Sequence, residues 1–425
     1  MTQITEPAAP DAGAAAAARW RELDAELVSP AYARYSDLVV ERAQGAHLFT
    51  VDGRDVLDFG CGIAVTNLGH NHPDVVAAVH RQVDLLWHTS VTALHPRAVE
   101  LAEALVRVSP EGLDQVFFCN SGAEAIEGAI KLARKATGRS ELIAFHGAFH
   151  GRTYGAVTLT ASKARYHAGI GPLLPGVHHV DYGVTAPLRR LFAAEVDPGD
   201  VAAIVVEPVL GEAGFVVPPA GFLPELRAIC DAHGILLVVD EVQTGFARTG
   251  KLFAVEHSGV RPDVMTLAKA LGNGLPIAAF LARGELMRAW SPGDHGTTFG
   301  GNPVACAAAV EVLHVIARDG LCDRAARLGA ATMERLRGWQ QWAPLLHEVR
   351  GLGLMIGVEM REPDGSAARQ ACKAWRLAAL RRGLLVLGSG TEENVMRLIP
   401  PLTIPEAELE KGLDILEEAL REVTA

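Results

Sequence analysis

The repeated alternation of short apolar segments with helical patterns constrains the fold of this chain more than any other feature. Apolar segments of strand length occur at residues 116–118, 141–145, 201–206, 235–239, 263–267 and 277–281. Helical patterns separate several of them, among others at residues 123–134 and 223–233. Continuous apolar strands that alternate with helices are typical of a mostly parallel sheet with helices on both faces. The stretch from about residue 95 to residue 305 is therefore predicted to form an α/β domain.

The flanking stretches follow other patterns. Residues 20–40 are weakly helical, and residues 47–51 and 55–59, joined by Asp52-Gly53, predict a β-hairpin. After residue 305 the sequence predicts a smaller α+β domain, with helices at 306–317, 367–382 and 405–423 and strands around 349–360, 384–387 and 395–399. We expect four parts: a flexible leader (1–18), an N-terminal segment that packs with the small domain (19–70), a large domain (71–318) and a small domain (319–425).

Composition and charge exclude several classes of function. The chain has 39 Lys and Arg against 50 Asp and Glu, a net charge of −11 over 425 residues, whereas a nucleic-acid binder needs a basic excess. No apolar run approaches the roughly 18 residues of a membrane span. Residues 1–18 lack the basic and bulky apolar parts of a signal peptide, and the six cysteines are scattered like buried thiols of a reducing compartment. We therefore expect a cytoplasmic protein with no nucleic-acid or membrane partner.

Asp240 and Lys269 are the strongest candidates for chemistry. Asp240 ends a fully apolar strand, and ligands of open α/β sheets bind at the carboxyl ends of strands. Lys269 follows the next apolar strand, among small and apolar residues. Loss of water there lowers the pKa of a lysine and makes its amine nucleophilic. A buried salt bridge between the two residues is an equally good interpretation of this pair alone.

Two segments offer hydrogen-bond donors for an anion. Ser121 is placed to cap the helix that begins near Ala123, and the N–H groups of Gly122 and Ala123 are open to a ligand. Thr298, in the Gly-rich segment 295–303, is a second donor for a phosphate. Each segment alone is also compatible with an ordinary capped helix or turn.

The loop after the strand at 141–145 offers a stacking face for a flat ligand, through Phe149 and His150. A metal site at His146 and His150 is disfavoured, because the intervening glycine spoils a helical i, i+4 arrangement and no third ligand has a matching spacing. We expect no metal.

An anion site, an aromatic stack, a carboxylate for a ring nitrogen and a lysine for an aldehyde together suit pyridoxal 5'-phosphate. With these residues in view, the chain resembles the class III, fold-type I aminotransferases that depend on this cofactor, and is most similar to 4-aminobutyrate and acetylornithine aminotransferases. The resemblance covers roughly residues 30–425 and lies in ordered blocks, at residues 62–70, 121–125, 149–153, 207–212, 240–245, 268–269, 298–303 and 397–403. It implies a large domain with a mostly parallel seven-stranded sheet flanked by helices, and a smaller α+β domain.

The resemblance also implies roles for matching residues. Lys269 would hold the cofactor aldehyde as a Schiff base and transfer protons, and Asp240 would pair with the pyridine nitrogen. The other implied contacts are Ser121, Gly122 and Ala123 at the phosphate, Phe149 and Val242 on the two faces of the ring, Gln243 at the ring hydroxyl, His150 and Glu207 in the same pocket, and Thr298 at the phosphate of a neighbouring subunit. A homodimer with shared active sites follows from the last contact, and pairing of dimers into tetramers stays open.

For the substrates, the resemblance assigns Arg397 to the α-carboxylate of glutamate or 2-oxoglutarate. Glu212 would pair with Arg397 when the substrate is an ω-amine that lacks this group, Arg152 would bind a distal carboxylate, and Ile63 is a further substrate-binding position. The implied activity is transfer of an amino group from an ω-amine donor such as 4-aminobutyrate to 2-oxoglutarate by a ping-pong mechanism.

Several alternatives remain at this point. Acetylornithine or ornithine aminotransferase also suits Arg152, and a class III racemase or decarboxylase uses the same lysine and aspartate. A cofactor-binding regulator has no use for the Arg397–Glu212 pair. Leu210 and Ala213 depart from the common residues of 4-aminobutyrate-type relatives, and the acidic segment 388–394 is either a solvated loop or selects a donor with an extra amine.

Overall fold

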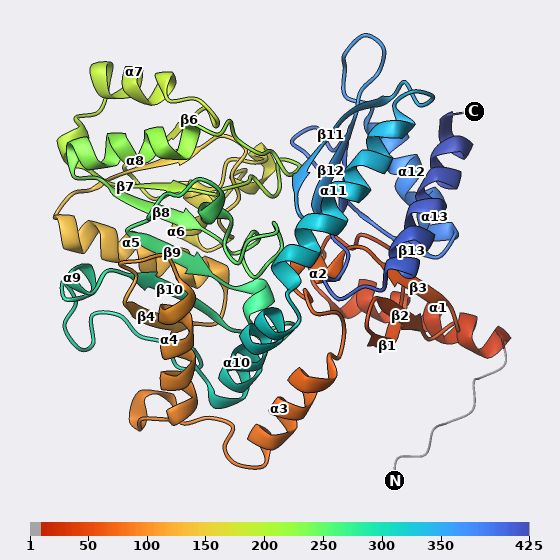
Figure 1. Ribbon diagram of the computed structural model, residues 1–425, viewed down its shortest axis with the longest axis horizontal. Coiled ribbons are helices and arrows are strands. Elements are labelled where there is room, and N and C mark those ends of the chain that lie inside the picture. The colour runs from red at the N-terminus through yellow and green to blue at the C-terminus, as the bar shows by residue number, and fades with distance from the viewer. Residues whose placement is uncertain (1–9, 425) are drawn as a thin grey trace.

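The computed structural model describes residues 10–424, and its central element is a seven-stranded sheet (Figure 1). The strand order is β4 (Gln115–Cys119), β10 (Ala278–Ala282), β9 (Val264–Leu267), β8 (Leu236–Asp240), β7 (Val201–Val206), β5 (Glu141–Phe145), β6 (Val177–Val180). β10 runs opposite to the other six strands, and every pair that does not include β10 is parallel. The mostly parallel sheet expected from the sequence is confirmed.

Alternating residues of each central strand face two different apolar clusters. In β7, for example, Ile204 and Val206 belong to the larger cluster, whereas Ala203 and Val205 belong to the second one. The second cluster includes residues of helices α5 (Gly122–Thr137) and α6 (Tyr154–Leu159). The larger cluster includes residues of α4 (Pro96–Val108), α8 (Phe222–His233) and α10 (Pro303–Arg318). Burial of both faces explains why these strands are apolar without alternation.

The N-terminal residues form a sheet that a late strand completes. Strands β2 (His47–Thr50) and β3 (Asp55–Asp58) form the predicted hairpin, and β1 (Val40–Gln44), which was not predicted, pairs antiparallel with β2. Strand β13 (Leu384–Leu385) pairs in parallel with β3. A third, antiparallel sheet has the order β11 (Leu346–Leu352), β12 (Met355–Met360), β15 (Val395–Leu398), β14 (Leu387–Ser389). Helices α11 (Leu321–Trp339), α12 (Arg369–Arg381) and α13 (Glu406–Thr424) accompany it (Figure 1).

Helix α1 (Pro10–Leu27) corrects the expectation at the N-terminus. Part of the predicted flexible leader, residues 10–18, is helical, because its alanine run has the highest helix propensity. Ala17 is buried, and a Cβ at Gly13 would lie 2.9 Å from the carbonyl oxygen of Val51, so this helix packs against the hairpin. Residues 1–9 of the expected leader lie outside the described residues. The helix ends before Pro30. The helical prediction for residues 28–39 is therefore wrong.

The remaining helices are α2 (Cys61–Ala64), α3 (Pro73–Val83), α7 (Ala186–Ala194) and α9 (Gly284–Met287), with single 3₁₀ turns at Ser90–Thr92, Ala164–Tyr166, Pro198–Asp200, Ala254–His257 and Lys269–Leu271. Within residues 10–424, no helix is both long enough and apolar enough to span a bilayer.

Candidate active site

A cavity of about 320 Å³ lies where several strands of the central sheet end. Its walls come from the segments that follow β4, β5, β7, β8 and β9, so it lies at the carboxyl ends of the parallel strands, where α/β proteins bind ligands. The lining residues are Val65, Asn120, Ser121, Gly122, Ala123, Phe149, His150, Gly151, Glu207, Asp240, Val242, Gln243, Ala268, Lys269, Gly274, Leu275, Pro276 and Ile277. Every residue that the sequence assigned to the cofactor lines it, except Thr298.

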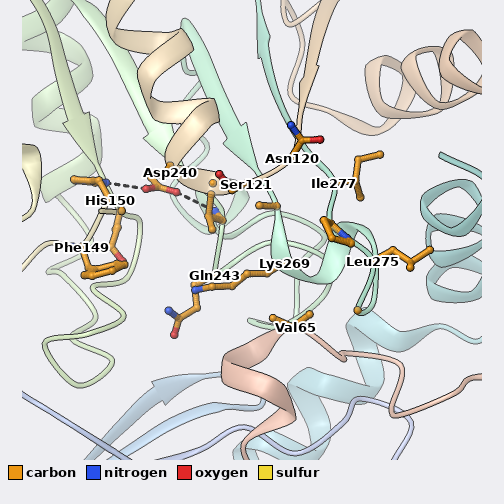
Figure 2. A pocket seen from close by; sticks show the side chains of 18 residues that line it. Val65, Asn120, Ser121, Phe149, His150, Asp240, Gln243, Lys269, Leu275 and Ile277 are labelled. Atoms are coloured by element: carbon orange, nitrogen blue, oxygen red, sulfur yellow. Dashed lines mark hydrogen bonds and ion pairs between the residues drawn. The ribbon is translucent and has the colours of Figure 1, made fainter. Parts of the chain in front are cut away.

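The carboxylate of Asp240 is the last group of β8 and faces this pocket from the sheet (Figure 2). Its Oδ2 lies 2.7 Å from Nδ1 of His150, and its Oδ1 accepts hydrogen bonds from the Val242 N–H (3.0 Å) and the Thr266 hydroxyl (3.1 Å). Burial alone would lower the pKa of His150, but the hydrogen bond and charge of Asp240 outweigh it and raise that pKa. Asp240 is therefore paired with His150, a partner that sequence reasoning did not identify.

Lys269 extends into the pocket from the turn after β9 (Figure 2). Its φ of 46° is in the left-handed region, which is uncommon for a residue with a side chain and marks a constrained backbone. Within residues 10–424, no carboxylate oxygen lies within 4.0 Å of its Nζ, so the salt bridge with Asp240 does not form. Burial lowers the pKa of Lys269, while the charges of Glu212 and Asp240 oppose that shift. An amine in this state is suited to attack a carbonyl carbon.

The N-terminus of α5 forms a second wall. Ser121 caps the helix by accepting a hydrogen bond from the Glu124 N–H (3.3 Å), as the sequence predicted. The N–H groups of Gly122 and Ala123 lie in the first turn and have no carbonyl partner inside the helix. A Cβ at Gly122 would lie 2.9 Å from both methyl groups of Val242, so only glycine lets this turn approach the pocket so closely. The result is a compact anion site.

Glu207 ties two loops of the pocket together. Its Oε1 accepts a hydrogen bond from the Phe149 N–H (2.8 Å) and its Oε2 accepts one from the Gly211 N–H (2.9 Å). Burial raises the pKa of this carboxyl to about 7, because the nearby charge of His150 only partly compensates. Gln243 is also buried, and its Oε1 has no hydrogen-bond partner within the described chain. A buried amide oxygen of this kind indicates a missing ligand.

Arg397 and Glu212 form a buried ion pair. The Arg397 side chain is 0% exposed in β15, and its Nη1 lies 2.9 Å from the Glu212 Oε1. Burial would raise the pKa of Glu212, but the charge and hydrogen bond of Arg397 lower it. The Arg397 Nε has no hydrogen-bond partner among residues 10–424, so the guanidinium keeps a donor for another acceptor.

Arg152 follows Phe149 and is exposed. Its guanidinium carbon lies 4.1 Å from the ring centre of Tyr166 and 5.7 Å from that of Phe149, while the two rings make an edge contact at 5.8 Å. In the described part of the chain, no carboxylate oxygen lies within 4.0 Å of it. The aromatic rings therefore orient Arg152 without neutralising its charge.

Five predicted residues lie outside the pocket lining: Thr298 and the four substrate candidates Ile63, Arg152, Glu212 and Arg397. Ile63, with a φ of 67°, packs on a small apolar cluster, and its neighbour Val65 lines the pocket instead. Thr298 is exposed in the segment 295–303 and does not line the pocket of its own chain. Sequence reasoning missed the wall formed by residues 274–277, although the turn-rich run Gly272-Asn-Gly-Leu-Pro276 before β10 was a usable signal.

The residues that depart from the common pattern have structural partners. Leu210 is buried in the main core and, with Ala213, faces Gly147, where a Cβ would lie 3.2 Å from each side chain. Neither lines the pocket. Glu393 of the acidic segment lies 3.4 Å from both Lys163 and Arg165, so its charge is already shared between two cations rather than held ready for an amine.

A carboxylate at a strand end, a buried lysine and a helix N-terminus around one cavity are the groups that a pyridoxal-phosphate site requires. The family model of the class-III aminotransferases matches residues 29–420. The chain is 45% identical to acetylornithine aminotransferase of Methanopyrus kandleri (94% of this chain, 98% of that one) and 42% identical to 4-aminobutyrate aminotransferase of Escherichia coli (91% and 94%). Its fold matches the crystal structure of ornithine aminotransferase from Toxoplasma gondii with a TM-score of 0.89, at 34% identity over 96% of this chain and 95% of the other.

The chain belongs to the class-III aminotransferases, and it is a pyridoxal-phosphate-dependent transaminase. Its pocket fits this cofactor on three independent observations: the close approach that Gly122 allows, the unpartnered Gln243 oxygen and the amine of Lys269 without an ion pair. Its substrates are a small-molecule amine and a keto acid.

Proposed function

We propose that this transaminase moves an amino group from an ω-amine donor, of the 4-aminobutyrate type, to 2-oxoglutarate in a ping-pong cycle. The Arg397–Glu212 pair carries the proposal, because a carboxylate that already neutralises a buried arginine equips the site for substrates with and without an α-carboxylate. With an ω-amine, Glu212 stays on Arg397. With 2-oxoglutarate, the α-carboxylate takes the place of Glu212 in a bidentate contact.

The cofactor supplies an aldehyde that binds amines and a ring that accepts electrons from the substrate carbon. In our proposal, Lys269 binds this aldehyde between cycles and moves the proton at the reacting carbon. Asp240, held by His150, keeps the pyridine nitrogen protonated. The phosphate would be held by Ser121 and the N–H groups of Gly122 and Ala123, and Phe149 and Val242 would hold the ring. The Gln243 Oε1 would accept a hydrogen bond from the ring hydroxyl, and Glu207 holds the Phe149 loop.

Arg152 is proposed to bind the carboxylate at the far end of the substrate. Its orientation over Tyr166 and Phe149 supports this role, since a guanidinium without a carboxylate partner is available for a bidentate contact. Ile63 would contact the substrate from the opposite wall, next to Val65. In this proposal residues 319–425 form a small domain that contributes Arg397, and residues 71–318 a large domain that holds the cofactor.

An acetylornithine- or ornithine-type activity is the second candidate. The observation that favours it is similarity, because the relative with 45% identity is an acetylornithine aminotransferase and the matching crystal structure is an ornithine aminotransferase. Arg152 would serve either donor, so it does not discriminate between them.

We further propose a homodimer in which Thr298 reaches the phosphate site of the partner. An apolar patch supports it: Leu85, Trp87, Val91, Leu94 and Phe299 are each 63% to 86% exposed. The rings of His88 and Phe299 lie 5.2 Å apart, so this patch is continuous with the segment that carries Thr298. Exposed apolar patches of this kind mark association surfaces.

A donor panel with 2-oxoglutarate as the acceptor tests the function. We expect glutamate from 4-aminobutyrate and 5-aminovalerate at higher kcat/KM than from N-acetylornithine or ornithine. The reverse order would assign the acetylornithine-type activity. Isomerisation of an amino acid without glutamate formation would reject transamination of ω-amines altogether.

A further inference from the structure

Cationic side chains gather around a second cavity, of about 270 Å³, which none of the roles above uses. Its walls come from residues 33–35, the turn at 163–166, helix α12 and residues 385–393. Its charged lining residues are Arg34, Lys163, Arg165, Lys373, Arg376 and a single carboxylate, Glu393. In a chain of net charge −11, such a concentration of positive charge favours an anionic ligand.

One side of the cavity carries a loosely held internal carboxylate. Glu393 lies 3.4 Å from both Lys163 and Arg165, longer than the roughly 2.8 Å of a strong charge-assisted hydrogen bond. The Glu393 side chain is 44% exposed, whereas that of Lys163 is only 12% exposed. Exposed and long ion pairs contribute little stability, so a better-placed carboxylate is able to replace Glu393.

The other side carries two cations without a carboxylate. Lys373 and Arg376 lie three residues apart on α12 and so face the same direction. Within residues 10–424, neither has a carboxylate oxygen within 4.0 Å. The Nε of Arg376 is buried without a hydrogen-bond partner in this part of the chain, and so is the hydroxyl of Ser389, a lining residue that is 2% exposed. Buried polar groups without partners are costly, and a bound ligand would satisfy them.

We propose that this cavity binds a small dicarboxylate. One carboxylate takes the place of Glu393 at Lys163 and Arg165, and the other engages Arg376, Lys373 and the Ser389 hydroxyl. Lys163 and Arg165 form one pair of cations, and Lys373 and Arg376 on α12 form another. Two separate pairs favour an anion with a charge at each end over a compact anion such as phosphate. The planar guanidinium of Arg376 suits a carboxylate in particular.

The cavity adjoins the substrate residues but does not contain them. The Arg376 guanidinium lies against the Gly388 backbone, where a Cβ would be 2.7 Å from its Cζ, and the Gly388 carbonyl accepts a hydrogen bond from Arg397 Nη2 (3.3 Å). Tyr166 lines the cavity and also lies under Arg152. The site therefore has to be tested in a protein whose own substrate arginines are disabled.

The test is calorimetric titration of succinate, which has two carboxylates and no reactive amine or carbonyl, into holoenzyme that carries Arg152→Gln and Arg397→Gln. We expect one binding event. Adding Arg376→Gln should weaken it at least tenfold, while the matched control Arg381→Gln should not, because Arg381 lies on the same helix but pairs with Glu422 outside the cavity. Retained cofactor absorbance shows that each variant is folded.

Glu393→Gln in the same background removes the internal competitor, so succinate should bind at least threefold more tightly, whereas Glu392→Gln should change nothing. Absence of binding, equal losses with Arg376→Gln and Arg381→Gln, or tighter binding of inorganic phosphate than of succinate would each overturn the proposal. Because these readouts measure binding without turnover, they are independent of the outcome of the donor panel.

Discussion

The Nη1 of Arg397 lies 2.9 Å from the Oε1 of Glu212, in an ion pair whose two side chains are almost fully buried. Arg397 belongs to the antiparallel sheet, and Glu212 follows the central strand β7. The pair therefore joins the two sheets. Because each charge is the main partner of the other, a change in either one leaves an uncompensated buried charge.

Arg397→Ala should affect substrates according to whether they carry an α-carboxylate. Loss of a buried charge partner costs about 3 kcal/mol, so we expect kcat/KM for 2-oxoglutarate to fall roughly 100-fold. A simple aldehyde acceptor should lose much less. Steady-state kinetics with both acceptors checks this, and equal losses would contradict a carboxylate contact at Arg397.

Lys269→Ala should abolish the visible absorbance of lysine-bound cofactor and reduce transamination to the background rate. Lys251→Ala is the matched control, since Lys251 is exposed and lies outside the pocket. An absorbance scan of both purified proteins after incubation with the cofactor is sufficient. An unchanged band in Lys269→Ala would show that another amine holds the aldehyde.

Glu207→Gln should change the pH dependence of stability. Burial raises the Glu207 pKa from 4.5 to about 7, so the folded chain keeps this proton up to about pH 7 while the unfolded chain releases it near pH 4.5. The free energy of unfolding of the wild type should therefore fall relative to that of the variant as the pH rises through this window, by at most about 3 kcal/mol. Urea unfolding of the holoenzyme between pH 4.5 and 8 measures the difference. A difference that is constant with pH would mean that Glu207 stays charged.

Gly122→Ala should weaken cofactor binding by overpacking the first turn of α5. Its Cβ would lie 2.9 Å from both methyl groups of Val242, and strain of this kind costs about 1–3 kcal/mol, or roughly 5- to 150-fold in affinity. Val242→Ala removes those methyl groups, so the double variant should recover part of the loss. Equilibrium titration of the apoenzyme with cofactor tests both. No recovery in the double variant would show that the loss has another origin.

Much of the fold is predictable because the signals are local. The predicted strands of the central sheet are uninterrupted apolar runs, and their predicted limits match the observed ones in β5 and β7 and differ by one residue in β4, β8, β9 and β10. Ser121 is recognisable as a cap because the hydrogen bond it accepts spans three residues. Helix α11 and strand β6 were not predicted. Strand β6 lacks a continuous apolar pattern because two of the four residues of Val177–Val180 are histidines.

The candidate site was predictable only as a set of residues. The sequence placed Asp240 and Lys269 at neighbouring strand ends, but it left a salt bridge between them as an open interpretation. In the structure His150, 90 residues from Asp240 in the chain, lies beside the carboxylate, and Lys269 has no ion-pair partner among residues 10–424. The cation that lies beside a buried carboxylate is set by the tertiary fold, and a short stretch of sequence does not specify it.

By itself, the sequence determined the α/β class, the order of most central strands and the residue types that pyridoxal phosphate requires, because hydrophobic periodicity and short motifs act over a few residues. Only the tertiary structure decided which charges meet. Arg397 meets Glu212, and Glu393 meets Lys163 and Arg165, across as many as 230 residues of sequence. Arg376 meets no carboxylate within residues 10–424. Such contacts depend on how the sheets pack, since the interaction of two charges depends on the distance between them in the folded chain.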